Sequence, residues 1–153
     1  MTPAILLDAG PLGKITNPNA TPENDECREW FGELLRAHVQ IFLPEIADYE
    51  VRRELLRAGK AEGIRRLDEL KAVVRYLPIN TQAMLNAAQF WAEARRGGQP
   101  AADDKALDGD VILAAQAAVI RTRGYDPVIA TTNPKHLERF VAAKFWKEIV
   151  VPS

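Results

Sequence analysis

Short apolar runs alternate with longer segments of helical periodicity along this chain. The continuous apolar run at residues 4–7 is typical of a strand that is buried on both faces, as strands of parallel sheets are. Strands that alternate with helices predict an α/β fold, a three-layer domain with a central, mostly parallel sheet flanked by helices. The other segments expected to be strands are 39–43, 73–79, 127–132 and 146–150.

Helices are expected between these strands. Apolar residues at helical spacing predict a helix over about 24–38, and Pro44 begins the next helix, where its missing N–H costs little. Thr81 is expected to cap a helix and Asp108 to open one, whereas residues 13–24 are rich in Gly, Asn and Pro and are expected to form a loop. Without a repeat or linker, residues 1–153 are expected to be one domain. The helices expected are 24–38, 44–58, 61–73, 81–96, 108–123 and 134–140, with breaks at 59–60 and 97–100.

Composition and charge exclude several classes of protein. The chain has 153 residues, of which 47% are hydrophobic and 27% charged, as in a soluble globular protein. A net charge of −1 excludes a histone-like protein that binds nucleic acid by bulk charge. The single cysteine, Cys27, excludes an intrachain disulfide and a cysteine-rich zinc site. The sequence has neither a signal peptide nor a membrane-spanning apolar run, so we expect a cytoplasmic protein with no membrane partner.

Acidic and polar residues follow the predicted strands or border the apolar rows of helices. Asp8 closes the first strand, and Thr131 and Asn133 close a late one. Glu50 and Asp110 lie on helices at positions that point partly inward. In open parallel sheets, ligands bind beyond the carboxyl ends of the strands, so all these residues are expected at one edge. Acids that point inward without a basic partner repel one another. A bound Mg²⁺ or Mn²⁺ ion usually relieves this repulsion.

Each residue also has a purely structural interpretation. Asp8 can end a strand by accepting hydrogen bonds from turn amides. Asp108 fits the N-cap of a helix, and Asp110 fits its first turn, where the helix dipole favours an acid. Asn133 can simply cap the short helix that follows it.

Five stretches of the chain, in this order, resemble PIN domains of the VapC toxin family. They are ILLDAGPL, LPEIADYEVRREL, LPINTQAMLNAAQFWAEARRGG, LDGDVILAAQA and VIATTNPKHLERF, which together extend over nearly the whole chain. The resemblance assigns the family's acidic quartet to Asp8, Glu50, Asp110 and the position of Asn133. Asparagine there removes one charge from the site, for which Asp108 would compensate.

The resemblance implies a metal-dependent endoribonuclease. Asp8 and Asp110 would hold Mg²⁺ or Mn²⁺, and Glu50 would orient a second metal ion or the attacking water. Asn133 and Thr131 would hold waters or carboxylates in place. The family also implies a toxin role, RNA as substrate, a cognate antitoxin as partner and a homodimer. The alternative is a PIN-like module that binds RNA or a partner protein without cleaving, because the site is one carboxylate short.

The segment 52–75 is basic, with eight Lys or Arg residues against four Asp or Glu residues. One interpretation is the solvated surface of a helical hairpin, in which Glu50 is an ordinary ion-pairing residue. Spacing alone does not distinguish Glu50 from Glu54. The other interpretation is a ridge that contacts RNA phosphates beside the metal site. Its candidate residues are Arg52, Arg53, Arg65 and Arg66.

Overall fold

The computed structural model of the protein describes residues 1–97 and 104–153. Its centre is a five-stranded sheet in the order β3-β2-β1-β4-β5. Each neighbouring pair of strands in the described part of the chain is parallel. This confirms the expected α/β fold, with a sheet that is parallel throughout rather than mostly parallel. The strands are β1 (Thr2–Leu7), β2 (Gln40–Pro44), β3 (Arg75–Leu77), β4 (Tyr125–Thr131) and β5 (Ala143–Phe145).

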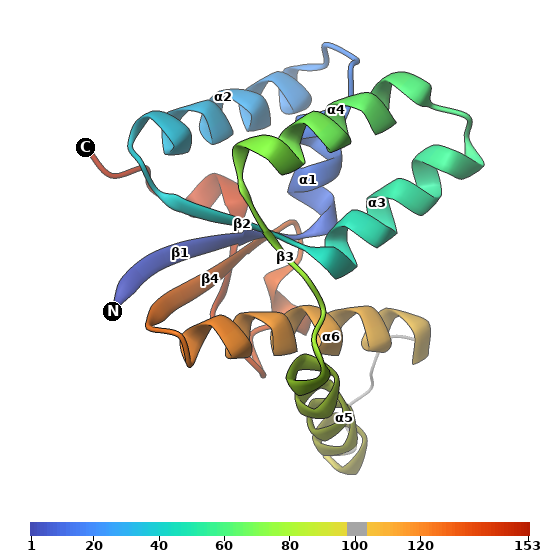
Figure 1. The fold of residues 1–153 in the computed structure, drawn as a ribbon, viewed down its shortest axis with the longest axis vertical. Coiled ribbons are helices and arrows are strands. Elements are labelled where there is room, and N and C mark those ends of the chain that lie inside the picture. The colour runs from blue at the N-terminus through green and yellow to red at the C-terminus, as the bar shows by residue number, and fades with distance from the viewer. Residues whose placement is uncertain (98–103) are drawn as a thin grey trace.

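Helices cover both faces of the sheet and make three layers (Figure 1). Helices α1 to α4 lie on one face, and α6 lies on the other, with α5 packed against it. They are α1 (Ala9–Thr16), α2 (Pro22–Arg36), α3 (Glu45–Arg57), α4 (Ala61–Val73), α5 (Thr81–Arg96) and α6 (Asp104–Arg121). No helix in the described part of the chain is long and apolar enough to cross a membrane.

The core is divided by the alternation of side chains along β1. Ile5 and Leu7 pack against α1 to α4, whereas Ala4 and Leu6 pack against α6. Because both faces of β1 are covered, every position of this run is apolar, as in other parallel strands. The alternation leaves Asp8, the first residue after β1, at the carboxyl edge of the sheet.

The expected loop over residues 13–24 is wrong. Helix α1 begins directly after Asp8 and continues to Thr16, and α2 begins at Pro22. Gly10 and Pro11 lie in the first turn of α1, where a missing N–H costs no intrahelical hydrogen bond. The loop is therefore only the short connection between the two helices.

The start of α6 also differs from the prediction. This helix begins at Asp104, so Asp108 is not its N-cap. Thr81 is the first residue of α5 rather than its cap, because the side chain of Asn80 accepts a hydrogen bond from the N–H of Ala83 at 2.8 Å. The break expected at 97–100 begins at Gly97, which ends α5, and its remaining residues lie outside the described part of the chain.

The C-terminal elements are shorter than expected. The helix predicted over 134–140 is a single 3₁₀ turn, Pro134–His136. The strand predicted over 146–150 is wrong, because β5 precedes it and Trp146–Glu148 form another 3₁₀ turn. Trp146 is fully buried and its ring lies 5.6 Å from that of Trp30, so this apolar segment serves the core without joining the sheet.

Candidate functional site

Asp8 is held in a fixed orientation at the carboxyl edge of the sheet. It is the N-cap of α1, and its Oδ1 accepts a hydrogen bond from the N–H of Ala9 at 2.7 Å. Its Oδ2 accepts a second from the hydroxyl of Thr131, also at 2.7 Å. Thr131 ends the neighbouring strand β4 and is buried. The parallel pairing of β1 with β4 thus places this hydroxyl against the carboxylate.

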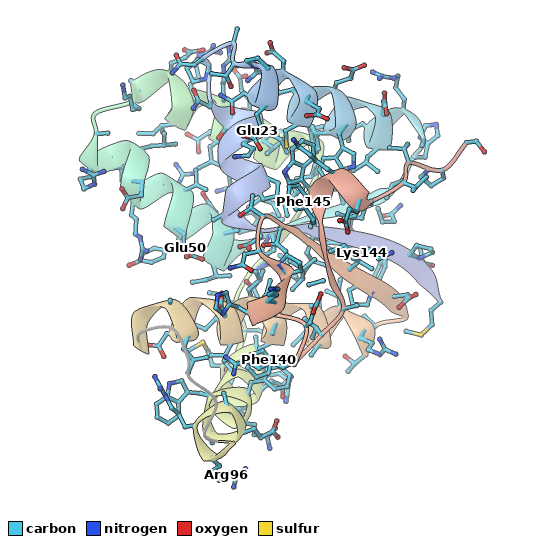
Figure 2. The ribbon with its side chains drawn as sticks, turned by 180° about the vertical axis from the view of Figure 1, so that it is seen from behind. Glu23, Glu50, Arg96, Phe140, Lys144 and Phe145 are labelled. Carbon is cyan, nitrogen blue, oxygen red and sulfur yellow. The ribbon has the colours of Figure 1, made fainter. Side chains whose placement is uncertain are left out.

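Glu50 and Asp110 approach Asp8 from helices on opposite faces of the sheet. Glu50 lies on α3 and is half-buried, and Figure 2 shows it on the side of α3 that faces α6. Gly109 of α6 lies against it, since a Cβ at Gly109 would stand 3.4 Å from Oε2 of Glu50. Asp110, the next residue of α6, is also half-buried.

Electrostatic interactions couple these three carboxyl groups. Burial raises the pKa of Asp8, and its hydrogen bonds from Thr131 and Ala9 partly oppose that shift. Burial, and then the charge of Asp8, raise the pKa of Asp110 to about 6. Burial and the charges of Asp8 and Asp110 also raise the pKa of Glu50. The structure therefore brings three like charges together, a pattern common at functional sites.

Two other candidate residues are placed differently. The side chain of Asn133 is exposed, and within the described part of the chain only its backbone N–H makes a hydrogen bond, to the hydroxyl of Thr131 at 3.1 Å. Asp108 is exposed and lines a separate hollow of about 420 Å³ beside Met84 and Trp91 of α5. Residues two apart on a helix do not share a face, so Asp108 and Asp110 point to different surroundings.

The oxygen-rich donor set fits a hard divalent cation. Within residues 1–97 and 104–153, the side-chain carboxylates of Glu50 and Asp110 make no hydrogen bond or ion pair, so their oxygens are available to a ligand. No three His, Cys, Asp or Glu side chains in the same residues stand close enough to hold a metal ion as they are. Binding would therefore require the carboxylates to move together, which their mutual repulsion opposes when no cation is present.

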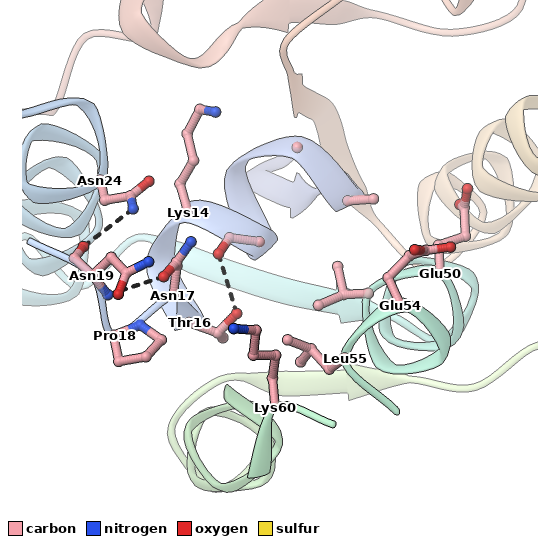
Figure 3. A pocket seen from close by; sticks show the side chains of 14 residues that line it. Lys14, Thr16, Asn17, Pro18, Asn19, Asn24, Glu50, Glu54, Leu55 and Lys60 are labelled. Carbon is pink, nitrogen blue, oxygen red and sulfur yellow. Dashed lines mark hydrogen bonds between the residues drawn. The ribbon is translucent and has the colours of Figure 1, made fainter. Parts of the chain in front are cut away.

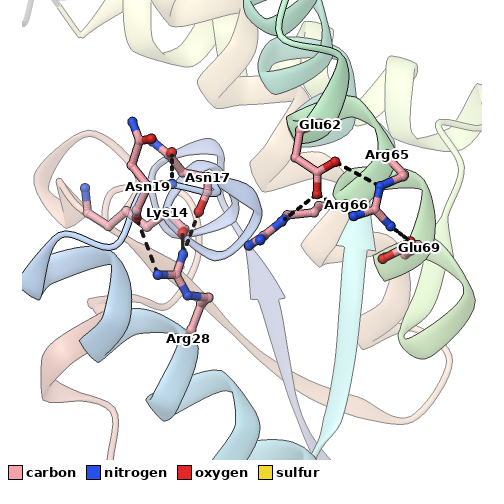
Figure 4. Close-up of polar contacts among 8 residues, drawn as sticks. All are labelled: Lys14, Asn17, Asn19, Arg28, Glu62, Arg65, Arg66 and Glu69. Carbon is pink, nitrogen blue, oxygen red and sulfur yellow. Dashed lines mark hydrogen bonds and ion pairs between the residues drawn. The ribbon is translucent and has the colours of Figure 1, made fainter.

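The candidate RNA-binding arginines of the α3–α4 hairpin are largely engaged within the protein. Arg52 pairs with Asp48 at 3.0 Å and with Asp68 at 2.8 Å. Arg65 and Arg66 pair with acids on their own helix, α4 (Figure 4). Arg53 lies over the ring of Tyr49, 5.2 Å from its centroid. Three of the four candidate arginines are thus paired with acids of the same hairpin.

A groove beside the acids was not foreseen from the sequence. It has a volume of about 600 Å³ and extends from Gly10 and Glu50 along α1 to the turn at 17–19 (Figure 3). Lys14 and Lys60 both line it. The only sequence signal was the Asn and Pro content of the turn, which indicated a loop but no cavity.

Comparisons with known proteins identify the fold. Neither family models nor curated proteins match this chain. A chain of VapBC2 from Rickettsia felis, solved bound to a DNA fragment from their promoter, is 14% identical with a TM-score of 0.68, covering 92% of this chain and 97% of that chain. A chain of the DNA-bound VapBC from Salmonella typhimurium is 24% identical with a TM-score of 0.62, covering 95% and 99%. VapC20 from Mycobacterium tuberculosis, described as a toxin that cleaves the sarcin-ricin loop, is 13% identical with a TM-score of 0.62, covering 90% and 96%. At such identities the likeness shows a shared PIN-like fold.

Proposed function

We propose that this chain is a PIN-domain protein of the VapC kind and acts as a Mg²⁺- or Mn²⁺-dependent endoribonuclease. The observation that carries the proposal is the meeting of Asp8, Glu50 and Asp110 at one edge of the sheet. The charge of Asp8 raises the pKa of both Glu50 and Asp110, and no basic residue forms an ion pair with the three carboxyl groups in the described part of the chain. The fold shared with VapC structures supports the same reaction.

In this proposal, Asp8 and Asp110 hold the metal ion, and Glu50 orients the attacking water or a second ion. The bound ion would lower the pKa of a water molecule and neutralise charge on the scissile phosphate. Thr131 orients Asp8 and favours its charged form, because its hydroxyl donates to Oδ2 and lowers the pKa that burial raises. Hydrolysis by in-line attack leaves a 5′-phosphate and a 3′-hydroxyl.

The proposed biological role is that of a toxin held inactive by a cognate antitoxin. Several similar structures are VapBC complexes, which supports a protein partner for this chain as well. RNA is the proposed substrate, and the description of the similar VapC20 as a sarcin-ricin loop cleaving toxin supports a cleaving role. A homodimer in the cytoplasm belongs to the same proposal.

One observation favours a second candidate, a module that binds RNA or a partner without cleaving. The three acids do not form a ready metal site among the described residues, and the fourth family position is Asn133, whose side chain is exposed. Both candidates share the fold and the groove. They differ in whether the acids bind a metal ion.

The test compares two substitutions on one helix. Asp110→Asn should abolish Mn²⁺ binding and metal-dependent cleavage of single-stranded RNA, measured by titration and by gel assay with and without EDTA. Asp108→Asn makes the same chemical change two residues away, on a different face of α6, and should retain both. Cleavage that persists in EDTA, or an Asp110→Asn variant with unchanged Mn²⁺ affinity, would contradict the proposal. Absence of Mn²⁺ binding by the wild-type protein would favour the non-cleaving module.

A further inference from the structure

The groove beside the acids begins at the candidate site and leads away from it. Gly10 and Glu50 line its inner end, next to Asp8, and the turn at Asn17–Asn19 lines its outer end (Figure 3). The stretch of α1 from Gly10 to Asn17 is about 10 Å long along the helix axis, at 1.5 Å per residue. One stacked nucleic-acid strand carries a phosphate about every 3.4 Å, so this length fits about three nucleotides.

Two lysines line the groove, and neither has a carboxylate partner among the described residues. Lys14 projects from α1, and Lys60 lies in the turn between α3 and α4. In the described part of the chain neither forms an ion pair, whereas Arg52, Arg65 and Arg66 of the neighbouring hairpin are all paired with acids. A paired arginine must break its ion pair before it can bind a phosphate. A free lysine has no such cost.

The outer wall of the groove is built from side-chain amides and is braced from α2. The side chain of Asn17 accepts a hydrogen bond from the N–H of Asn19 at 2.9 Å, and Asn24 donates to the carbonyl of Asn19 at 3.2 Å. Arg28 donates to the carbonyl of Asn17 at 2.6 Å (Figure 4), and it also pairs with Asp25. Asparagine amides both donate and accept hydrogen bonds, so this wall suits the edges of unstacked bases.

We propose that this groove carries the RNA strand on one side of the scissile bond, with Lys14 and Lys60 contacting its phosphates. The inference rests on the proposed nuclease function and adds the path of its substrate. It also assigns phosphate binding to the groove lysines, in place of the arginine ridge of the hairpin. An acidic site needs such cations nearby, because the carboxylates repel the polyanion that they are to cleave.

The first test measures the salt dependence of RNA binding. Binding of a labelled single-stranded RNA is followed by fluorescence anisotropy in the Asp110→Asn background, so that the RNA stays intact. Lys14→Gln together with Lys60→Gln should weaken binding and reduce the slope of log affinity against log salt by about 1.4, because each phosphate contact contributes about 0.7. Glutamine has a helix propensity similar to that of lysine at position 14, and Lys60 lies outside the helices without a side-chain capping hydrogen bond, so folding should be unaffected. Lys144→Gln is the control for each single lysine substitution, because it also removes one charge, in a different hollow beside Thr2 and Ile149.

The second test blocks the groove without removing charge. Gly13 lines the groove, and a Cβ at this position would have no heavy atom within 4 Å. Gly13→Leu should therefore place an alkyl side chain in the groove and abolish RNA binding at concentrations where Gly13→Ala still binds. Both variants should melt at or above the wild-type temperature, since Ala and Leu are better helix formers than Gly.

Each outcome decides a different point. If the wild-type protein cleaves RNA but the lysine and Gly13→Leu variants keep the affinity and salt slope of their parent, the RNA path is wrong and the nuclease proposal stands. If the wild-type protein neither cleaves nor binds RNA, both proposals are wrong. The groove would then be a candidate binding site for a segment of a partner protein. A reduced slope with the lysine variants, unchanged with Lys144→Gln, supports the path.

Discussion

Two glycines of α1 lie three residues apart but have different surroundings. A Cβ at Gly13 would have open space around it, whereas a Cβ at Gly10 would stand 2.6 Å from Cγ2 of Thr132 and 2.8 Å from its Oγ1. Glycine to alanine within a helix stabilises by about 0.5–1 kcal/mol. We expect Gly13→Ala to show this gain in urea unfolding and Gly10→Ala to lose stability, because Thr132 must move. Equal effects of the two substitutions would contradict this account.

Asp110 should make the metal-free protein less stable as the pH rises. Its pKa in the folded protein is raised to about 6 from an ordinary value of 3.8. The folded state therefore binds the proton more tightly, and stability falls as the pH rises from about 4 to about 6. In EDTA, Asp110→Asn should melt higher than the wild type, with a difference that is small at pH 4 and largest above pH 6. A lower melting temperature of the variant at pH 7 would contradict this account, and the helix dipole would not explain it, because Asp110 lies beyond the first turn of α6.

Thr131 acts on the site through Asp8. Its hydroxyl donates to Oδ2 of Asp8 at 2.7 Å and accepts from the N–H of Asn133 at 3.1 Å. Removal of a partner that orients a metal ligand typically lowers metal affinity about 10–100-fold. Thr131→Val should show that loss in a Mn²⁺ titration while RNA binding in EDTA is retained. Thr131→Ser keeps the hydroxyl and should restore the affinity, which a merely steric role would not predict.

At the scale of elements, the α3–α4 hairpin is joined by a charged cluster at its base. Asp48 is buried and pairs with Arg52 at 3.0 Å, with Lys71 at 3.8 Å and with the hydroxyl of Tyr76 at 3.0 Å. Asp68 pairs with the same arginine but is exposed. Loss of hydrogen bonds to a charged group costs about 1.5–3 kcal/mol, so Asp48→Asn should destabilise by that amount. Asp68→Asn is the matched control and should cost about 0–1 kcal/mol, as exposed pairs do. Similar losses from both in chemical denaturation would rule out this distinction.

Elements with strong periodicity could be predicted closely, and those set by tertiary contacts could not. Helix α4 begins and ends where the sequence predicts, because Gly59 and Lys60 interrupt the pattern before it. Helix α1 was missed because Gly10 and Pro11 are poor helix formers, and its start depends on the capping carboxylate of Asp8. The segment after β5 is apolar like a strand, but Trp146 instead fills the core beside Trp30.

The candidate site shows the same division. Asp8 and Thr131 could be predicted because each ends an apolar strand and the carboxyl ends of parallel strands meet. Spacing could not separate Glu50 from Glu54, since both border one apolar row. The structure separates them, because Glu54 is exposed and pairs with Arg57 while Glu50 faces Asp8. The groove lysines had no local signal, because their isolation depends on which acids the fold places near them.

For the whole molecule, the arrangement of ion pairs matters more than the net charge. The basic excess of 52–75 is partly compensated by acids of the same hairpin, such as Glu62 and Glu69, which pair with Arg65. We therefore expect Arg65→Gln with Arg66→Gln to change the RNA salt slope less than Lys14→Gln with Lys60→Gln. Fluorescence anisotropy across a salt series compares the two double variants directly. A larger change of slope for the arginine variant would indicate that the hairpin, and not the groove, binds the phosphates.

The sheet order has a consequence for how the proposed toxin is made. The hydrogen bond between Thr131 and Asp8 joins residues 123 positions apart, and the two strands that carry them are neighbours in the sheet. Because β1 precedes β4 along the chain, Asp8 is synthesised before the strand that carries Thr131. In the proposed nuclease, this carboxylate would therefore lack the hydrogen bond that orients it until β4 has been made and has paired with β1.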